Sequence, residues 1–459
     1  MECIDVAIVG GGPAGSSAGA AAAAAGADTV IIEKGVPRAD RKCIGPDSTD
    51  AAGFLDYWVD IAEIDYRDLP DGVILQPITS ATFFGPTERV VVRDTGIDAS
   101  YPHFGFTFHR ARFDDWLRRR AENAGAEYRI GTGVRNVDST VTSRGHHHVL
   151  TLRDGTQLRA EYVVLADGPQ RTVTIPTLNQ FVSKDRSISD LLGPSTANHI
   201  AYQEYRRFPE AVFEPDTLKF WWGWMPGETA YPWIFPNDGA TARVGLTMPF
   251  VVDIDAVDDP EAYRLLQPDD EHVPRGSVYI RRLLEELYGD EYDTETEFPL
   301  VEDRGKSGGI EAYPISSTKP IDSPTAAGIA VTGGAMGATS PFHEGGGHVA
   351  IRSGTLAGRL AAERRLEAYN DAWKAAIGTE VSMNVAAAKL VEGYAPRDWN
   401  RALAAGRRIG VDRDSFNLRR LPSATGLVAC EIAARYGLHR WRFRNGGYVQ
   451  LREDEYVYR

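Results

Sequence analysis

Three glycines near the start of the chain have the spacing of a phosphate-binding turn. Gly10, Gly12 and Gly15 fit the pattern G-x-G-x-x-G, and Glu33 follows later in the chain. In such a turn the first glycine makes a tight bend, the second lets a pyrophosphate approach the backbone, and the third lets a helix pack against a strand. A carboxylate at this distance accepts hydrogen bonds from a ribose. These residues in this order predict a dinucleotide site.

The flanking sequence supplies the elements that such a site needs. Residues 5–10 are typical of a short buried strand, residues 18–25 continue a helix, and residues 29–33 form a second strand that ends in the acid. The helix begins at the glycines, so its free N–H groups and positive dipole end face the phosphates. These elements follow one another at the expected spacing: a strand, the glycine turn, a helix, a second strand and the acid. That order favours a nucleotide site over a glycine-rich turn without a ligand. The motif alone does not choose between NAD and FAD.

A second group of chemically useful residues lies in the middle of the chain. Large aromatic residues are concentrated between residues 220 and 235, and a polar turn at 237–240 separates them from another apolar run. This pattern predicts antiparallel strands joined by a tight turn. The aromatic residues either fill a sheet core or line a long apolar pocket with one face of the sheet.

Composition and charge limit the class of protein. The chain has 459 residues, and 64 acidic residues against 50 basic ones give a net charge of −14. This length suits two or three domains, and the acidic balance argues against a general nucleic-acid binder. Three scattered cysteines and no signal-peptide pattern predict a cytoplasmic protein without disulfides. Residues 6–27 carry no charge but are mostly Gly and Ala, so we expect a soluble nucleotide fold there and not a membrane span.

Further motifs resemble a known group of flavoproteins. A helix opening at Arg110 is followed by a strand-like run that ends in Ala-Asp-Gly at residues 166–168, as in the p-hydroxybenzoate hydroxylase fold. Residues 231–236 match the Y-x-W-x-F-P motif of the geranylgeranyl reductases, and residues 110–114 match their R-x-x-F-D helix start. Residues 42–45 fall where that family carries its cysteine segment. No second G-x-G-x-x-G occurs, which argues against a dedicated nicotinamide domain.

The resemblance implies an FAD enzyme that saturates C=C bonds of isoprenoid chains, including those of archaeal membrane lipids. Cys43 is then the catalytic candidate beside the isoalloxazine, as proton donor or positioning group. An external electron donor is implied, and NADPH, reduced ferredoxin and a deazaflavin all stay open. The implied FAD-contacting residues are Gly10, Gly12, Ala14, Gly15, Glu33, Lys34, Cys43, Ile44, Arg110, Val134, Gly334, Ala335, Gly346 and Gly347.

The implied substrate is an isoprenoid lipid held by aromatic residues. Its expected contacts are Trp222, Tyr231, Trp233 and Phe235. Saturating an alkene needs a hydride, which a reduced flavin supplies, and a proton. Aromatic faces could also stabilise positive charge that builds on the alkene carbon.

The second flavin motif of the family is altered in this chain. Gly334 stands where the family has an acid that touches the ribityl hydroxyls, and an uncompensated loss of those hydrogen bonds costs about 1–3 kcal/mol. Glycines still precede a predicted helix over residues 349–360. His343 and His348 lie in this turn, where either could relay a proton near pH 7 or act as a polar turn residue. Glu344 could replace the missing acid.

Two other features remain open. The triplet at residues 146–148 is all histidine but lacks Cys or acid partners at ligand spacing, so we predict no metal site. Arg-rich runs with aromatic residues at 440–444 fit a peripheral contact with anionic headgroups at the inner membrane face. A solvated helical face is the other interpretation of those runs.

We therefore expect an α/β protein with a Rossmann-type FAD-binding domain, an antiparallel β substrate domain and a C-terminal helical region. The expected FAD-binding parts are residues 1–75, 105–175 and 310–360. The substrate domain takes 76–104 and 176–309, and the helical region takes 361–459. The alternative functions are an FAD-dependent monooxygenase or halogenase-like enzyme on the same fold, and a non-catalytic flavin- or lipid-binding protein.

Overall fold

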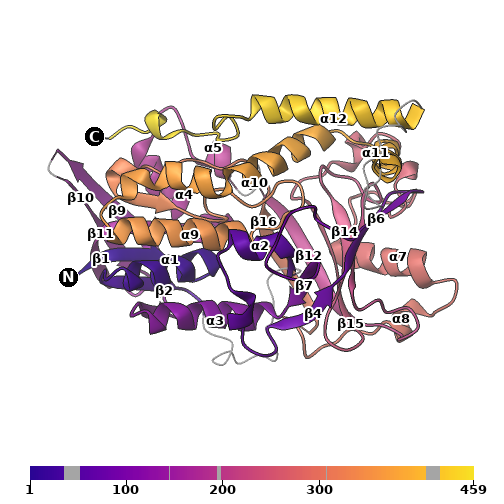
Figure 1. The fold of residues 1–459 in the computed structure, drawn as a ribbon, viewed down its shortest axis with the longest axis horizontal. Helices are drawn as coiled ribbons and strands as arrows, with labels where there is room; N and C mark the ends of the chain where they lie inside the picture. Colours follow the sequence, from indigo (N-terminus) through magenta and orange to yellow (C-terminus); the bar gives the residue numbers. More distant parts are fainter. Residues whose placement is uncertain (36–51, 144, 194–197, 306–307, 410–423, 459) are drawn as a thin grey trace.

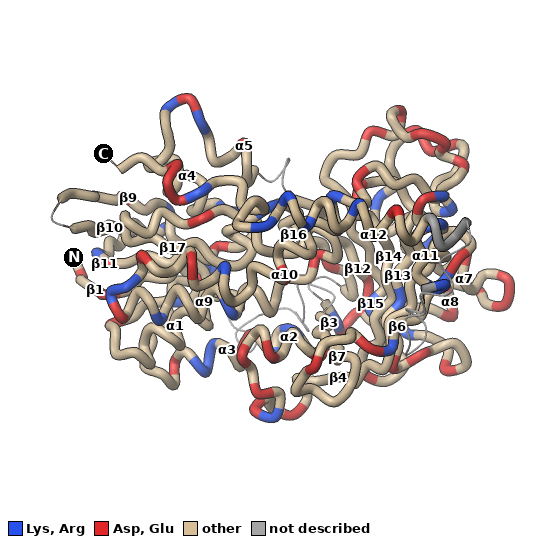
Figure 2. Tube along the Cα trace, turned by 45° about the horizontal axis from the view of Figure 1, so that its top comes forward, with Lys and Arg blue, Asp and Glu red and all other residues tan. Residues whose placement is uncertain are grey.

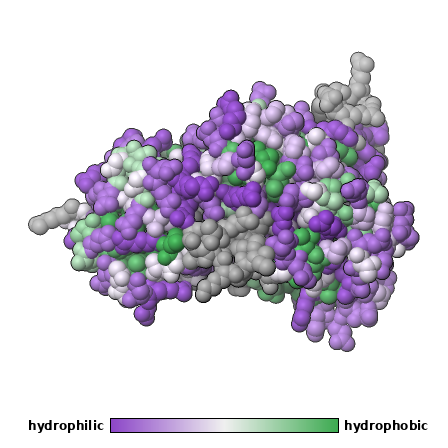
Figure 3. All heavy atoms as spheres, turned by 90° about the horizontal axis from the view of Figure 1, so that it is seen from below, coloured by the Kyte–Doolittle hydropathy of each residue, from purple (hydrophilic) through white to green (hydrophobic). Residues whose placement is uncertain are grey.

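Two large sheets lie next to each other in the computed structural model, and helices pack on more than one side of them (Figure 1). The structure describes residues 1–35, 52–143, 145–193, 198–305, 308–409 and 424–458. Acidic and basic residues are interspersed along the backbone in both halves of the molecule (Figure 2). The face shown in Figure 3 is mostly hydrophilic, and its apolar atoms gather in small separate patches.

The first sheet has the strand order β8-β2-β1-β11-β10-β9, and β17 also pairs with β11. Neighbouring strands among β1, β2, β8, β11 and β17 run parallel, whereas β9 and β10 are antiparallel additions. Val6 to Val9 and Val30 to Ile32 are buried, as expected for parallel strands covered on both faces. The bounds are β1 (Glu2–Val9), β2 (Thr29–Glu33), β8 (Glu127–Ile130), β9 (Val134–Thr142), β10 (Gly145–Leu152), β11 (Gln157–Leu165) and β17 (Ile329–Val331).

Helices of small residues pack closely beside this sheet. Any side chain at Gly354 or Gly358 would overlap the carbonyl oxygens of Ala14 or Ala18. The uncharged Gly- and Ala-rich segment therefore serves close helix–helix packing. The helices of this half are α1 (Pro13–Ala24), α3 (Arg110–Asn123), α4 (Thr174–Leu178), α5 (Ser189–Leu192) and α9 (Gly347–Ala362).

The second sheet has the strand order β16-β12-β15-β14-β13-β5-β6. All its pairs are antiparallel except β5 with β13. Its strands are β5 (Ser80–Phe84), β6 (Arg89–Val92), β12 (Asn198–Arg207), β13 (Thr217–Trp221), β14 (Tyr231–Pro236), β15 (Thr241–Pro249) and β16 (Ile310–Ser316). A small sheet of order β3-β7-β4 with one helix completes this half: β3 (Gly53–Leu55), β4 (Ile74–Ile78), β7 (Gly105–Phe108) and α2 (Asp56–Ile61).

One helix of the second half was not predicted from the sequence. The helix α7 (Gly276–Tyr288) contacts β12 and β15, and α8 (Thr294–Glu297) follows it. Tyr279, Ile280, Leu283 and Leu284 form its buried stripe, which joins the core under the second sheet. The middle of the chain therefore contains a helical cover as well as the expected strands, while the α/β class with a Rossmann-type part and an antiparallel sheet is confirmed.

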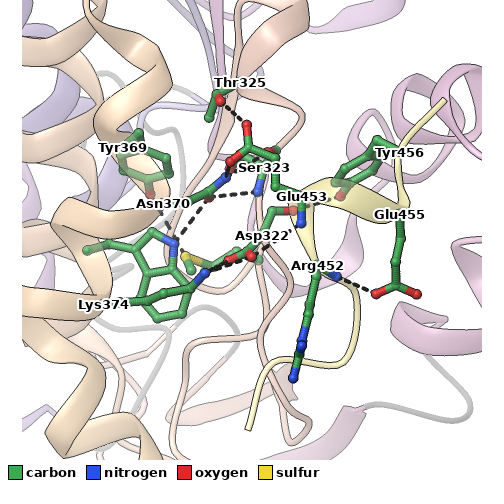
Figure 4. Close-up of polar contacts among 12 residues, drawn as sticks. Asp322, Ser323, Thr325, Tyr369, Asn370, Lys374, Arg452, Glu453, Glu455 and Tyr456 are labelled. Carbon is green, nitrogen blue, oxygen red and sulfur yellow. Dashed lines mark hydrogen bonds and ion pairs between the residues drawn. The ribbon is translucent and has the colours of Figure 1, made fainter. Parts of the chain in front are cut away.

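Three helices near the C-terminus form the helical region: α10 (Tyr369–Val391), α11 (Pro396–Ile409) and α12 (Ala424–Arg442). A buried polar cluster fixes α10 and the final segment to the loop before β17 (Figure 4). Lys374 forms an ion pair with Asp322 at 2.7 Å, and Asn370 donates to Glu453 at 2.8 Å. None of the helices in the described ranges combines the length and apolar character that crossing a bilayer requires.

Candidate active site

A cavity of about 360 Å³ opens at the carboxyl ends of β1 and β2, where α1 begins. This is the edge at which parallel α/β sheets bind nucleotides. Many of the residues expected to hold the cofactor line it from segments far apart in sequence. They are Gly10, Gly12, Ala14, Glu33, Lys34, Arg110, Val134, Gly334, Gly346 and Gly347.

The glycine turn leaves its backbone open to a ligand. Gly10 has φ +98°, and a Cβ there would lie 2.5 Å from the carbonyl oxygen of Ala166. Gly12 is the N-cap of α1, and a Cβ at this position would meet nothing within 4 Å. Gly15 lies behind the turn against the carbonyl of Gly10 and does not line the cavity. The turn therefore presents N–H groups at a helix N-terminus to the cavity.

The carboxylate of Glu33 fixes the glycine turn from the end of β2. One oxygen accepts a hydrogen bond from the N–H of Gly11 at 2.7 Å, and the other accepts from the N–H of Gly35 at 2.6 Å. Because each carboxylate oxygen accepts more than one hydrogen bond, Glu33 retains acceptor capacity toward a ribose in the cavity.

A buried arginine supports the loop at Gly334. The guanidinium of Arg171 donates to the carbonyl of Gly334 at 2.8 Å and to that of Ala335 at 3.1 Å. Gly334 lines the cavity, whereas Ala335 is buried behind it with its carbonyl turned to Arg171. Burial lowers the pKa of Arg171 to about 10, so the side chain stays charged at pH 7. Sequence reasoning missed this residue, although it follows the Ala-Asp-Gly run by only three positions.

A second cavity of about 280 Å³ lies against the aromatic strands. Trp222, Tyr231, Trp233 and Phe235 all line it, so the structure brings the four expected substrate contacts together. Further aromatic and apolar side chains from the small sheet and from β5 and β13 complete the wall: Phe54, Phe83, Phe104, Leu218 and Phe220. The result is a pocket with few polar groups, of the kind that binds apolar ligands.

The ring of Trp233 lies across a glycine of the neighbouring strand. Trp233 on β14 pairs with Gly245 on β15, and a Cβ at Gly245 would lie 2.5 Å from the indole. On the outer side of the pocket, Trp222 packs edge-on against Trp399 of α11, with 4.3 Å between ring centroids. The glycine gives Trp233 room to lie flat on the sheet, and this keeps the cavity open.

The two cavities share one wall. Seven residues line both of them: Pro13, Arg110, Tyr313, Ile315, Glu344, Gly346 and Gly347. Gly346 and Gly347 form the N-terminus of α9, so N–H groups and the positive helix end also face this wall. A ligand that reaches across the first cavity therefore meets a ligand held in the second.

Two histidines of the turn before α9 pack on Trp58. His348 stacks on its ring with centroids 4.2 Å apart, and His343 does so at 5.2 Å. Glu380 of α10 lies 3.5 Å from Nε2 of His348 and 4.0 Å from Nε2 of His343. Burial lowers the pKa of His343 to about 4 and also lowers that of His348. Both rings are therefore neutral at pH 7, and of the two only His343 lines the aromatic cavity.

The carboxylate of Glu344 is held by the second sheet. It accepts a hydrogen bond from Thr247 of β15 and contacts Nδ1 of His199 on β12. Glu344 lines the same cavity as Gly334, and the expectation that it replaces the missing acid stays a prediction. Cys43 and Ile44 lie outside the described residues, so their assigned roles stay predictions.

Known proteins with similar sequences are named reductases. No protein-family model matches the chain. It is 24% identical to the digeranylgeranylglycerophospholipid reductase of Methanosarcina acetivorans over 398 residues, which cover 84% of each protein. It is 29% identical to the geranylgeranyl diphosphate reductase of Rhodobacter capsulatus over 252 residues, 53% of this chain and 54% of that protein. The chain is related to the geranylgeranyl reductases.

Solved structures show the same relationship in the fold. A geranylgeranyl bacteriochlorophyll reductase-like protein from Thermoplasma acidophilum superposes with a TM-score of 0.68 at 19% identity, covering 97% of this chain and 99% of that one. A myxobacterial FAD-dependent chondrochloren halogenase superposes with a TM-score of 0.55 at 18% identity, covering 96% and 97%. The fold is thus one that flavoproteins of several activities share, and the sequence relatives are reductases.

Proposed function

We propose that the protein is an FAD-dependent reductase that hydrogenates C=C bonds of geranylgeranyl-type chains, with membrane-lipid precursors as the substrate class. The observation that carries this proposal is the wall shared by a nucleotide-type cavity and an aromatic cavity. That arrangement supports the proposal because an apolar chain in the second cavity would lie next to a dinucleotide cofactor in the first. The reductase names of the sequence relatives support the same substrate class.

The residues of the first cavity fit FAD. Gly12 and the N-terminus of α1 offer N–H groups to a pyrophosphate, and Glu33 offers acceptors to a ribose. Gly346 and Gly347, at the start of α9, offer N–H groups to the carbonyl edge of an isoalloxazine. When bound and reduced, FAD would supply a hydride to the alkene. An external donor would return the electrons, and its identity as NADPH, ferredoxin or a deazaflavin stays open.

The aromatic cavity suits an isoprenoid chain. Each CH₂ group moved from water into such a wall contributes about 0.8 kcal/mol. The faces of Tyr231 and Trp233 add attraction for positive charge at the reacting carbon, worth about 2 kcal/mol when water is excluded. The pocket residues therefore bind the chain, hold one double bond at the shared wall and keep water away from it.

We also propose a peripheral contact between α12 and anionic membrane lipids. Leu438 and Trp441 are 46% and 57% exposed, and Arg444 lies 4.5 Å from the ring of Trp441. Exposed apolar groups next to arginines suit a charged headgroup layer. Flotation with phosphatidylglycerol vesicles tests this contact: wild type should co-float and Trp441→Ala should not. Equal behaviour of the two proteins would contradict it.

The function is tested by following the flavin spectrum without oxygen. Protein loaded with FAD and reduced with dithionite should be reoxidised by a geranylgeranyl lipid but not by its fully saturated counterpart. The saturated lipid is the matched control, because it fills the same pocket but accepts no hydride. A flavin that stays reduced with both lipids, or a protein that never takes up FAD, would contradict the proposal.

A further inference from the structure

We propose that the carboxyl group of Glu344 donates the proton in alkene reduction and that His199 is the residue that positions it. This inference rests on the proposed function. It concerns which residue of the chain completes the reaction, since a hydride alone does not saturate a double bond.

Glu344 lies at the one place where both ligands would be within reach. Of the seven residues in the shared wall, it alone carries a carboxyl group. Its side chain is 2% exposed, so the carboxyl group is buried beside the boundary of the two cavities and is shielded from bulk water. A general acid acts within hydrogen-bond reach of the reacting atom or through one bridging water, and such a water would connect the buried carboxyl group to a ligand at this wall.

The second sheet holds the carboxyl group from two neighbouring strands. The hydroxyl of Thr247 on β15 donates to Oε2, and Nδ1 of His199 on β12 contacts Oε1. β12 and β15 are paired antiparallel, which fixes these two partners relative to each other. The carboxyl group therefore has a defined orientation before any ligand binds, and such preorganisation favours proton transfer.

The backbone at Glu344 gives independent support. Its φ is +58°, in the left-handed region that favours glycine, and the three residues that follow are all glycine. A glycine would fit this turn without strain, whereas a glutamate raises its free energy. The strain is maintained by the contacts of the carboxyl group with the second sheet, a pattern found where a side chain has a functional role.

The step balances as follows. As the π bond of the alkene breaks, bound and reduced FAD would supply a hydride to one carbon, and the Glu344 carboxyl group would supply a proton to the other. Two C–H bonds would form, with the alkene reduced and the flavin oxidised. The carboxylate regains its proton from water by way of His199, the titratable side chain in contact with it.

Anaerobic stopped-flow with the FAD-loaded protein tests the role of Glu344. Glu344→Gln should slow reoxidation of the reduced flavin by a geranylgeranyl lipid at least 100-fold, in line with the loss of a general acid. The dissociation constant for FAD, measured by fluorescence, should stay within threefold. Glu204→Gln is the control. Glu204 on β12 is also a buried glutamate, but it lines neither cavity.

Chemical rescue separates proton donation from a structural role. In Glu344→Gly, which relieves the backbone strain and opens space, sodium formate should raise the rate at least tenfold. His199→Phe should slow the step and increase its solvent deuterium isotope effect, because proton transfer becomes limiting. A Glu344→Gln rate within fivefold of wild type, loss of FAD binding in that variant, or no formate effect would overturn the inference. Failure of wild type itself to react would instead contradict the proposed function.

Discussion

The guanidinium of Arg171 donates a hydrogen bond to the carbonyl oxygen of Gly334 at 2.8 Å. This contact joins the turn after β11 to the loop after β17, two segments that are far apart in sequence. It turns the carbonyls of Gly334 and Ala335 away from the first cavity. A Cβ at Gly334 would lie 3.3 Å from Cδ of Pro169, so the loop also leaves little room for a side chain. The missing acid is thus accompanied by a buried cation that holds the backbone in place.

Replacing Arg171 should weaken FAD binding and destabilise the fold. The side chain is fully buried and donates six hydrogen bonds, so Arg171→Met leaves several buried acceptors without a donor. We expect at least tenfold weaker FAD binding, measured by fluorescence titration, and a lower urea midpoint. The FAD affinity and the urea midpoint of Arg171→Lys should lie between those of wild type and Arg171→Met, because a lysine is charged but cannot reproduce the planar set of donors. A folded Arg171→Met protein with wild-type FAD affinity would contradict this role.

Glu33→Ala should reduce FAD affinity without removing the fold. It deletes the carboxylate that accepts from Gly11 and Gly35 and that lines the first cavity, where a ribose is expected. A loss of about 1–3 kcal/mol corresponds to roughly tenfold to a hundredfold in the dissociation constant. Glu127→Ala on the adjacent strand is the control, because Glu127 pairs with Arg129 outside the cavity. Equal FAD affinities for the two variants would argue against Glu33 as a ribose ligand.

Gly245→Val should change the length of chain that the protein accepts. The new side chain would collide with the ring of Trp233 and push it into the aromatic cavity. We expect turnover of a geranylgeranyl lipid to fall at least tenfold, turnover of a shorter farnesyl or geranyl lipid to fall less, and FAD affinity to stay unchanged. Gly437→Ala on α12, where a Cβ meets nothing, is the control. A uniform loss for all chain lengths would indicate a folding defect.

Cys43→Ala tests the role beside the isoalloxazine that the family resemblance implies, which is positioning when Glu344 donates the proton. We expect this variant to bind FAD and to lose most of its turnover. The measurement is steady-state reduction of a geranylgeranyl lipid, with Cys3→Ala as the control because Cys3 is exposed on β1. Full turnover in a flavin-loaded Cys43→Ala protein would remove the residue from the mechanism.

The stability of the fold should fall on mild acidification, in part through His148. Burial lowers the pKa of His148 to about 3, whereas an unfolded histidine titrates near 6.5. Between these values the unfolded chain takes up a proton that the folded protein excludes, so stability is lost as pH falls below 6.5 and is unaffected above it. The contribution is roughly 2 kcal/mol between pH 7.5 and 5.

Urea unfolding at these two pH values measures the contribution of His148. His148→Leu should lose less stability on acidification than wild type, because it no longer carries the excluded proton. His147→Leu is the control, since its side chain faces the other side of β10. If His148→Leu shows the same pH dependence as wild type, another group is responsible.

Local signals made much of the first half predictable. The turn at Gly10 to Gly15, the strand that ends at Glu33 and the helix α9 have short-range patterns that specify both structure and ligand type. From the residues alone, the aromatic run that includes β14 could fill a sheet core or line a pocket, and the family resemblance favoured the pocket. The helix α7 carries an apolar stripe but no capping residue with a side-chain bond, and it was not recognised.

Other parts of the site depend on contacts between distant segments. Arg171 meets Gly334 across 163 positions, and the carboxylate of Glu344 meets Thr247 across 97. No local pattern encodes such pairs, because the order of strands in each sheet brings them together. Sequence motifs therefore indicated the cofactor class and the aromatic pocket, whereas the structure was needed to find the residues at their boundary.

The most direct test of the central claim is the mass of the product. Protein loaded with FAD, reduced with dithionite and kept free of oxygen is mixed with a geranylgeranyl lipid, and the extracted lipid is analysed by mass spectrometry. The proposed function predicts that the lipid gains two hydrogen atoms for each double bond reduced, while the flavin is reoxidised. A lipid of unchanged mass beside a fully reduced flavin would contradict it.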